Sequence, residues 1–188
     1  FGSVALPGAA QAAEAHPFKR AVVCPSGRDR NGRVAYAHLT FQQLDRESDR
    51  LAYGLQRAGI GRGVRTTLLV RPSIGFFELT FAVFKVGAVP VVVDPGMGVR
   101  RMLACFRSTR PQAFVGVPLA HAVRTLFPNY FGTVTTWVTV GRRWFWGGHT
   151  LEKLRGPAWK PFELAPTARD ETAAILFTTG STGPARGA

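Results

Sequence analysis

Lysine and acidic residues are both scarce in this sequence of 188 residues. It carries 24 Lys and Arg against 11 Asp and Glu, a formal net charge of +13, and its lysines are Lys19, Lys85, Lys153 and Lys160. A positive charge of this size is typical of proteins that bind nucleic acid. The arginines, however, stand singly or in pairs, without a long basic run, a zinc-ligand spacing or an aromatic RNA-binding motif. We therefore expect no specific nucleic-acid partner, and a basic nucleic-acid-binding module stays as the alternative of another class.

Cysteine and long apolar runs are scarce as well. Cys24 and Cys105 are too few and too isolated for a disulfide framework or a metal site, and their apolar neighbours predict small buried side chains. No apolar run approaches the ~18–20 residues that cross a bilayer. The Ala-rich residues 1–15 lack the charged start and strong apolar centre of a signal peptide. We expect no transmembrane segment and a cytoplasmic location.

Apolar residues are plentiful. A hydrophobic content of 46% and an aromatic content of 11% are typical of a folded globular protein. We expect a poorly specified lead-in over residues 1–17 and one folded unit over residues 18–188. The sequence starts without Met and stops directly after a glycine-rich loop, where a helix is due. We therefore expect a fragment that is open at both ends.

Strand and helix patterns alternate over most of the chain. Strands are predicted at residues 64–70, 89–93, 113–117, 136–140 and 173–177. Helices are predicted from Ser73 to Gly87, around Met102 and near residues 121–127. Alternation of this kind requires right-handed crossovers and a parallel sheet that is covered on both faces. The predicted fold class is α/β, a doubly wound, largely parallel sheet with flanking helices.

The first part of the chain predicts two local structures. Residues 21–24 and 33–39 flank Asn31-Gly32, which indicates an antiparallel pair. Thr40 and Gln43 form a capping box for a helix that ends at Gly59. Its apolar face is Phe41, Leu44, Leu51, Ala52, Leu55 and Ala58. Its charged residues Asp45, Arg46, Glu47, Asp49 and Arg50 are predicted to form a solvated face, and Phe76, Phe77, Phe81 and Phe84 of the next helix are predicted to be core.

Three features remain open as site candidates. Residues 141–172 are irregular, and Arg142-Arg143-Trp144-Phe145-Trp146 could stack on a base, grip an acyl chain or, as we favour, pack as a small satellite core. His121 and His149 have no neighbour that indicates a metal or general-base role. Asp94 follows a strand, where it could bind a ligand or cap the next turn.

The last stretch carries the strongest signal. The apolar run 173–177 leads into a loop of hydroxyls, glycines and one cation, Thr178 to Gly187. Glycines let backbone N–H groups turn toward a ligand, and hydroxyls and Arg186 add donors for phosphate oxygens. The spacing fits neither a Walker loop nor a dinucleotide fingerprint. An ordinary polar turn is the alternative, since Ser, Thr and Gly also dominate turns.

Residues 177–187 resemble the ATP-phosphate loop of the adenylate-forming (AMP-binding) superfamily, Tyr/Phe-Thr-Ser-Gly-Thr/Ser-Thr-Gly-x-Pro-Lys-Gly. Thr179 replaces a serine, Ala185 a proline and Arg186 a lysine. Losing the proline makes the loop less rigid, and arginine keeps the charge with a planar fork. The resemblance implies that Thr178, Thr179, Gly180, Ser181, Thr182, Gly183 and Arg186 bind ATP phosphates.

Earlier stretches extend this resemblance over residues 20–188. They include Thr40 to Asp45, Leu51 to Leu55, Gly59 to Gly63 and Phe84 to Pro90. Further stretches, among them 61–66, 93–96, 116–121 and 140–143, look most like the β-lactone synthetases of bacterial olefin biosynthesis.

The resemblance implies an AMP-forming enzyme of the acyl-CoA synthetase type. It would use ATP and Mg²⁺ to activate a fatty-acid-type carboxylate, and a 2-alkyl-3-hydroxy fatty acid would close to a β-lactone. A fatty acyl-CoA ligase is the alternative, and association with other lipid-pathway enzymes is compatible with either. The catalytic residues stay unknown, and the Mg²⁺ ligands, the adenine site and the C-terminal domain are expected beyond Ala188, so the fragment alone is expected to be inactive.

Overall fold

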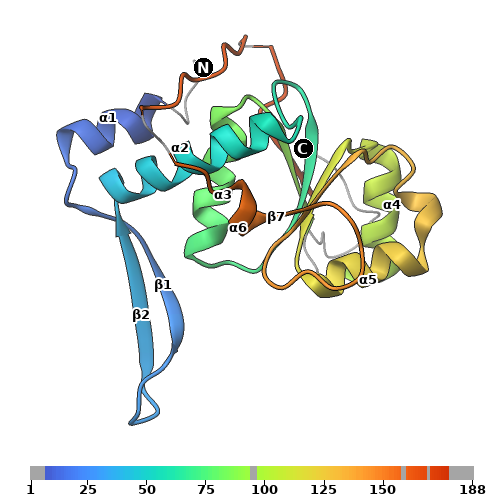
Figure 1. Cartoon of the computed structure of the whole chain (residues 1–188), viewed down its shortest axis with the longest axis horizontal. Coiled ribbons are helices and arrows are strands. Elements are labelled where there is room, and N and C mark those ends of the chain that lie inside the picture. Colours follow the sequence, from blue (N-terminus) through green and yellow to red (C-terminus); the bar gives the residue numbers. More distant parts are fainter. Residues whose placement is uncertain (1–6, 94–96, 158–159, 169, 178–188) are drawn as a thin grey trace.

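The computed structural model of the chain describes residues 7–93, 97–157, 160–168 and 170–177 (Figure 1). The helices are α1 (Pro7–Ala15), α2 (Phe41–Arg57), α3 (Ile74–Lys85), α4 (Val99–Thr109), α5 (Pro118–Leu126), the 3-10 turn η2 (Pro128–Tyr130) and α6 (Leu151–Leu154). The strands are β1 (Arg20–Arg28), β2 (Val34–Thr40), β3 (Arg65–Leu69), β4 (Val89–Val93), β5 (Ala113–Gly116), β6 (Thr136–Thr139), β7 (His149–Thr150) and β8 (Ile175–Phe177). Among the described residues, no helix is long and apolar enough to cross a membrane.

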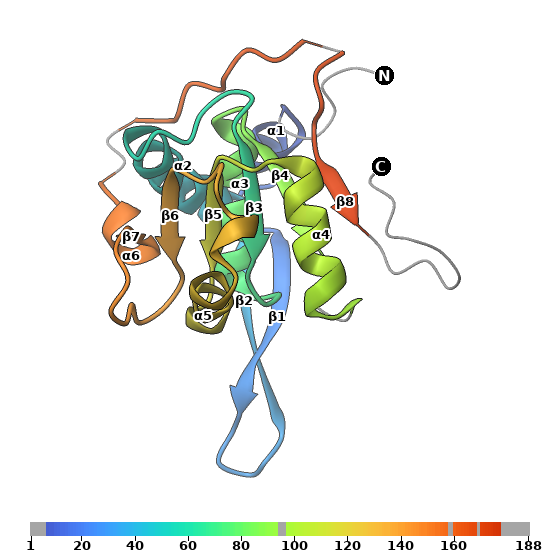
Figure 2. The same ribbon diagram turned by 90° about the vertical axis from the view of Figure 1, so that its right-hand side faces the viewer.

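Six strands form one parallel sheet in the order β7-β6-β5-β3-β4-β8 (Figure 2). The five strands predicted from the alternating pattern are all present and all parallel, so the predicted fold class is confirmed. The short β7 was not predicted, because two residues are too few to produce a pattern. β3 lies between β4 and β5, so the chain reverses its direction across the sheet after β4.

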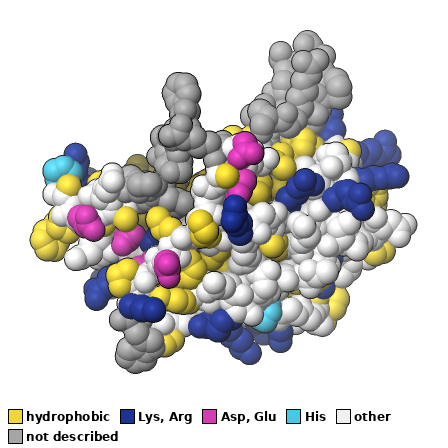
Figure 3. Space-filling model, turned by 90° about the horizontal axis from the view of Figure 1, so that it is seen from above, with side chains coloured by type: hydrophobic (Ala, Val, Ile, Leu, Met, Phe, Trp, Pro, Cys, Tyr) yellow, Lys and Arg dark blue, Asp and Glu magenta, His cyan; other side chains and the backbone are white. Residues whose placement is uncertain are grey.

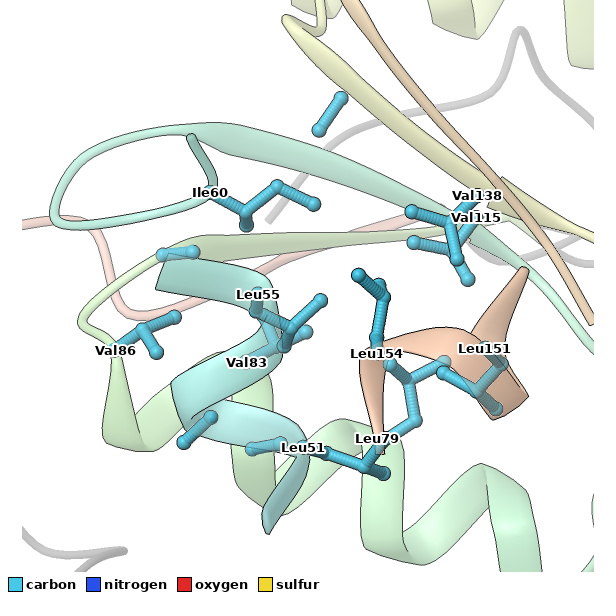
Figure 4. Close-up of a cluster of buried hydrophobic side chains, with 14 of the residues drawn as sticks. Leu51, Leu55, Ile60, Leu79, Val83, Val86, Val115, Val138, Leu151 and Leu154 are labelled. Atoms are coloured by element: carbon cyan, nitrogen blue, oxygen red, sulfur yellow. The ribbon is translucent and has the colours of Figure 1, made fainter. Parts of the chain in front are cut away.

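Helices cover both faces of this sheet. α2, α3 and α6 lie on one side of the strands, and α4 and α5 lie on the other (Figure 1). We name these the α2 face and the α4 face. The core of the α2 face is aliphatic, with side chains from all three helices packed on the strands (Figure 4). Its labelled members are Leu51, Leu55, Ile60, Leu79, Val83, Val86, Val115, Val138, Leu151 and Leu154.

The core of the α4 face is rich in aromatic rings. The Phe114 ring lies in its middle, with centroids 5.5 Å from both Phe131 and Trp137 and 6.2 Å from Phe106. Cys105 is buried in this core as predicted, and burial raises the pKa of its thiol. Edge-to-face contacts of this kind stabilise aromatic pairs beyond the area that they bury.

The predicted local structures of the first part of the chain are present. β1 and β2 form an antiparallel hairpin that extends away from the rest of the molecule (Figures 1 and 2). The capping box forms, since the Gln43 amide nitrogen donates to the Thr40 hydroxyl and the Thr40 amide donates to the Gln43 side chain. Gly59 has a φ of +82°, which suits the end of a helix. α1 lies within residues 1–17, for which the sequence specified no element.

The charged side of α2 is a solvated face at Arg46, which is exposed, but that prediction is wrong for its carboxylates. The Lys85 ammonium is buried and lies 2.7 Å from an Asp45 carboxylate oxygen and 2.6 Å from one of Asp49. Glu47 pairs with Arg155 at 2.8 Å, and Arg155 also pairs with the buried Glu78. These partners join α2 to α3 and to the end of α6, so the charged side chains hold three helices together.

The four phenylalanines of α3 are half-buried and are not the core of this helix. Its core side is made of Leu79, Ala82 and Val83, which are fully buried. The apolar pattern runs around the whole helix, so it could not show which side faces the sheet.

Candidate functional site

The end of β8 is where the structure meets the predicted phosphate loop. Phe177 is buried in the core of the α4 face and pairs with Val93, the last residue of β4. The segments that follow β4 and β8 therefore leave the sheet from neighbouring strands, at the same end. The predicted residues Thr178, Thr179, Gly180, Ser181, Thr182, Gly183 and Arg186, together with Asp94, lie outside the described residues and stay predictions.

The surroundings of this end of the sheet suit an anionic ligand. In parallel α/β sheets, ligands bind beyond the carboxyl ends of the strands, near the point where the strand order reverses. That point here is β3 with its neighbours β4 and β5. The helices α3, α4 and α5 each follow one of these strands, so their N-termini lie at this end. Helix N-termini carry partial positive charge, which favours phosphate over a cation.

His121 is the most strongly shifted titratable group at this end of the sheet. It is fully buried on α5, and its Nε2 lies 3.1 Å from the Val138 carbonyl oxygen. A carbonyl only accepts, so Nε2 carries the proton and donates. Nδ1 faces the Arg124 guanidinium at 3.4 Å. Burial lowers the pKa of His121 to about 4. The nearby Arg124 charge also lowers this pKa, whereas the hydrogen bond to Val138 raises it.

Trp146 completes this cluster from the loop that follows β6. Its ring stacks on His121 with centroids 5.3 Å apart and planes inclined by 15°. Its indole Nε1 donates to the Thr139 hydroxyl at 3.0 Å. The Arg124 guanidinium lies 3.8 Å from the Trp137 ring centroid, a cation–π geometry. Every polar atom of the His121 ring has a partner, so this is a structural histidine that stays neutral at pH 7.

The contacts of this cluster bear on the predictions for His121 and for the segment from Arg142 to Trp146. No metal or base role was expected for His121, and its contacts give it a packing role. Arg142 to Trp146 is a satellite core only in part, because Trp146 is 5% exposed whereas Trp144 is 55% and Phe145 82% exposed. The contact between His121 and Trp146 could not be found from sequence, since 25 residues separate them without any shared motif. The described residues contain no group of three His, Cys, Asp or Glu side chains that could hold a metal ion.

Comparison with known proteins identifies the relatives of this chain. A family model described as "AMP-binding enzyme" matches residues 9–188. An olefin beta-lactone synthetase of Xanthomonas campestris is 49% identical over 177 residues, which cover 93% of this chain and 32% of that protein. The enzyme of the same name from Stenotrophomonas maltophilia is 48% identical over 179 residues, again covering 93% of this chain and 32% of that protein.

A solved structure shows the same fold. The long-chain-fatty-acid-CoA ligase of Archaeoglobus fulgidus superposes with a TM-score of 0.79 over 97% of this chain and 35% of its own, at 18% identity. The chain thus spans about a third of the length of the relatives that it matches.

Proposed function

Because this chain belongs to the family of AMP-binding enzymes, we propose that it is the N-terminal part of an ATP-dependent, carboxylate-activating enzyme. The observation that carries the proposal is the position of β8. It is a parallel strand beside β4 whose last residue, Phe177, is buried, and it ends at the end of the sheet where nucleotide phosphates bind in α/β folds. The proposed phosphate ligands are the Thr178, Thr179, Ser181 and Thr182 side chains and the Gly180 and Gly183 backbones, with Arg186 neutralising charge.

The proposed reaction joins the substrate carboxylate to the α-phosphorus of ATP and releases pyrophosphate. Such chemistry depends on positioning and on stabilisation of the charge that is redistributed as pyrophosphate leaves. ATP enters with Mg²⁺, for which the described residues offer no ligand cluster, so no step of this chain is assigned to the ion.

The proposed substrate is a 2-alkyl-3-hydroxy fatty acid that closes to a β-lactone. Its own hydroxyl would attack the activated carboxyl and displace AMP. The support is the identity of 49% and 48% to two proteins named olefin beta-lactone synthetase. A fatty acyl-CoA ligase is the second candidate, because structural relatives carry that name. The two differ only in the nucleophile, an internal hydroxyl or an external thiol.

One experiment separates these two candidates. The complete polypeptide that carries this chain is given ATP, Mg²⁺ and a 2-alkyl-3-hydroxy fatty acid, with and without CoA, and the products are identified by mass. We expect AMP, pyrophosphate and a β-lactone without CoA. Formation of an acyl-CoA only when CoA is present would replace the lactone by the ligase reaction. Absence of AMP under both conditions would contradict carboxylate activation itself.

A further inference from the structure

Acidic residues are absent from one continuous part of the chain. Between Asp94 and Glu152 the sequence has no Asp or Glu, but it has seven arginines, namely Arg100, Arg101, Arg107, Arg110, Arg124, Arg142 and Arg143. This part contains α4, β5, α5 and β6. In the part of the chain that the structure describes, none of the seven forms an ion pair. In Figure 3 the right-hand part of the face in view shows blue side chains and no magenta ones.

The loop 141–148, which we name the aromatic loop, is held in one conformation by its own contacts. Gly141 and Gly148 have φ values of +91° and +102°, and the Arg143 guanidinium donates to the Gly148 carbonyl at 2.6 Å, which closes the loop. A Cβ on Gly148 would lie 2.6 Å from the Trp137 carbonyl oxygen, so the loop is held tightly against β6. Together with the buried Trp146 ring, these contacts fix the loop on the body of the protein.

This anchoring presents two other aromatic rings to solvent. The Trp144 and Phe145 rings contact Trp146, with centroids 5.3 and 5.1 Å from it, yet more than half of each residue is exposed. Arg142 beside them is exposed as well. α5 begins at the same end of the sheet with the exposed Leu119 (Figure 2). Exposed aromatic rings beside arginines, in a stretch of sequence without carboxylates, match the groups that bind at a membrane–water interface.

We propose that the aromatic loop docks this protein on an anionic lipid surface. Trp144 and Phe145 insert their rings at the level of the headgroups, and Arg142 meets lipid phosphates. The remaining arginines between Asp94 and Glu152 contribute attraction over the distance that screening allows. A duplex nucleic acid or an acidic protein would use the charge, but neither requires two adjacent apolar rings at the tip of a loop.

Vesicle co-sedimentation tests this proposal on the complete polypeptide. We expect binding to vesicles of phosphatidylglycerol and phosphatidylcholine, weak binding to pure phosphatidylcholine, and a loss of affinity as salt is raised. The double variant Trp144→Ser/Phe145→Ser should bind the anionic vesicles about tenfold more weakly, since it removes the inserted rings. Arg142→Gln should weaken binding about fivefold.

Matched controls lie on the β1–β2 hairpin and just before it, at Phe18, and the hairpin is at the other side of the molecule in Figure 1. Phe18→Ser/Tyr36→Ser removes two similarly exposed rings, and Arg30→Gln removes one exposed charge. We expect both variants to bind vesicles like the parent. Quenching of tryptophan fluorescence by brominated acyl chains should occur in the parent and in these controls, and should be lost on Trp144→Phe.

Three results would overturn the proposal. They are no binding to anionic vesicles, an equal loss in the hairpin controls, or binding to duplex DNA or an acidic protein that exceeds binding to vesicles. The assay needs neither ATP nor a carboxylate substrate, so its failure would leave the proposed function standing.

Discussion

The two faces of the sheet are stabilised by different means. On the α2 face, an aliphatic core is bordered by ion pairs, with Lys85 between Asp45 and Asp49 and Arg155 between Glu47 and Glu78. On the α4 face, the described residues form no ion pair, and edge-to-face, tilted and stacked rings surround Phe114 and His121. The strands are shared by both faces. The difference shows that ion pairs form on the face that has carboxylates. The seven arginines that lie in the stretch of chain without carboxylates form no ion pair among the described residues.

The largest expected effect comes from breaking the charge pairs of the α2 face. Lys85→Met leaves two carboxylates beside a buried position, of which Asp49 is itself buried. Burial already raises the pKa of Asp49, and the hydrogen bond from Lys85 opposes that shift. Removing one partner of such a pair typically costs about 3–5 kcal/mol, and we expect a loss near 4 kcal/mol in the free energy of unfolding. Urea unfolding of the chain at pH 7 measures it.

Two variants control this prediction. Lys153→Met removes an exposed lysine and should change stability by less than about 0.5 kcal/mol. Lys85→Met/Asp49→Asn removes both buried charges and should recover much of the loss. If the double variant is as unstable as Lys85→Met, then volume and not charge explains the effect.

The next effect is a dependence of stability on pH that arises on the α4 face. His121 has a pKa of about 4 in the folded chain, against about 6.5 when it is exposed. From pH 6.5 down to pH 4 the unfolded chain therefore binds a proton that the folded chain does not, and stability falls. A difference of this size corresponds to about 3 kcal/mol, lost by pH 4 and fully regained above pH 6.5.

Denaturant unfolding between pH 4 and 8 tests this dependence against His121→Gln. The glutamine cannot titrate, so its stability should fall less on acidification than that of the parent. His149→Gln is the matched control, because this histidine is exposed. Parallel pH curves for the parent and His121→Gln would remove His121 from the explanation.

The smallest of these effects concerns the aromatic packing itself. Phe114→Leu keeps an apolar side chain but loses edge contacts to three rings and a tilted contact to a fourth, and we expect about 1–1.5 kcal/mol of destabilisation. The effect should be equal at low and high salt, since no charge is involved. Phe145→Leu should be neutral, because this ring is 82% exposed. A comparable loss of stability in both variants would show that the ring contacts of Phe114 do not explain its effect.

Features that depend on neighbours in sequence were predictable. The capping box at Thr40, the left-handed Gly59 and all five main strands follow from patterns a few residues long. The prediction for the charged side of α2 was wrong because the partners of these side chains lie far away in the chain. Lys85 binds carboxylates 40 and 36 residues earlier, and Arg155 reaches Glu47 across 108 residues. A charged helix side looks the same in sequence whether it meets water or such a partner.

The candidate site was predictable in another way. A motif predicts its loop, which lies outside the described residues and stays a prediction, and the structure confirms the strand before it. The sequence could not show which ring of the aromatic loop is buried, because Trp144, Phe145 and Trp146 are chemically alike. Only the stack on His121 distinguishes the buried ring from the exposed pair.

The central claim is that the segment after β8 binds the phosphates of ATP. Its most direct test is the single-turnover rate of acyl-adenylate formation by the complete polypeptide, measured for Arg186→Ala, with Arg30→Ala on the hairpin as the control and thermal melts to exclude unfolding. We expect Arg186→Ala to lower the rate about 10²–10³-fold with fatty-acid binding little changed, Arg186→Lys to recover most of it, and Gly180→Val to be at least as damaging as Arg186→Ala. A well-folded Arg186→Ala protein that forms the adenylate at a near-normal rate would contradict the claim and make the segment an ordinary turn.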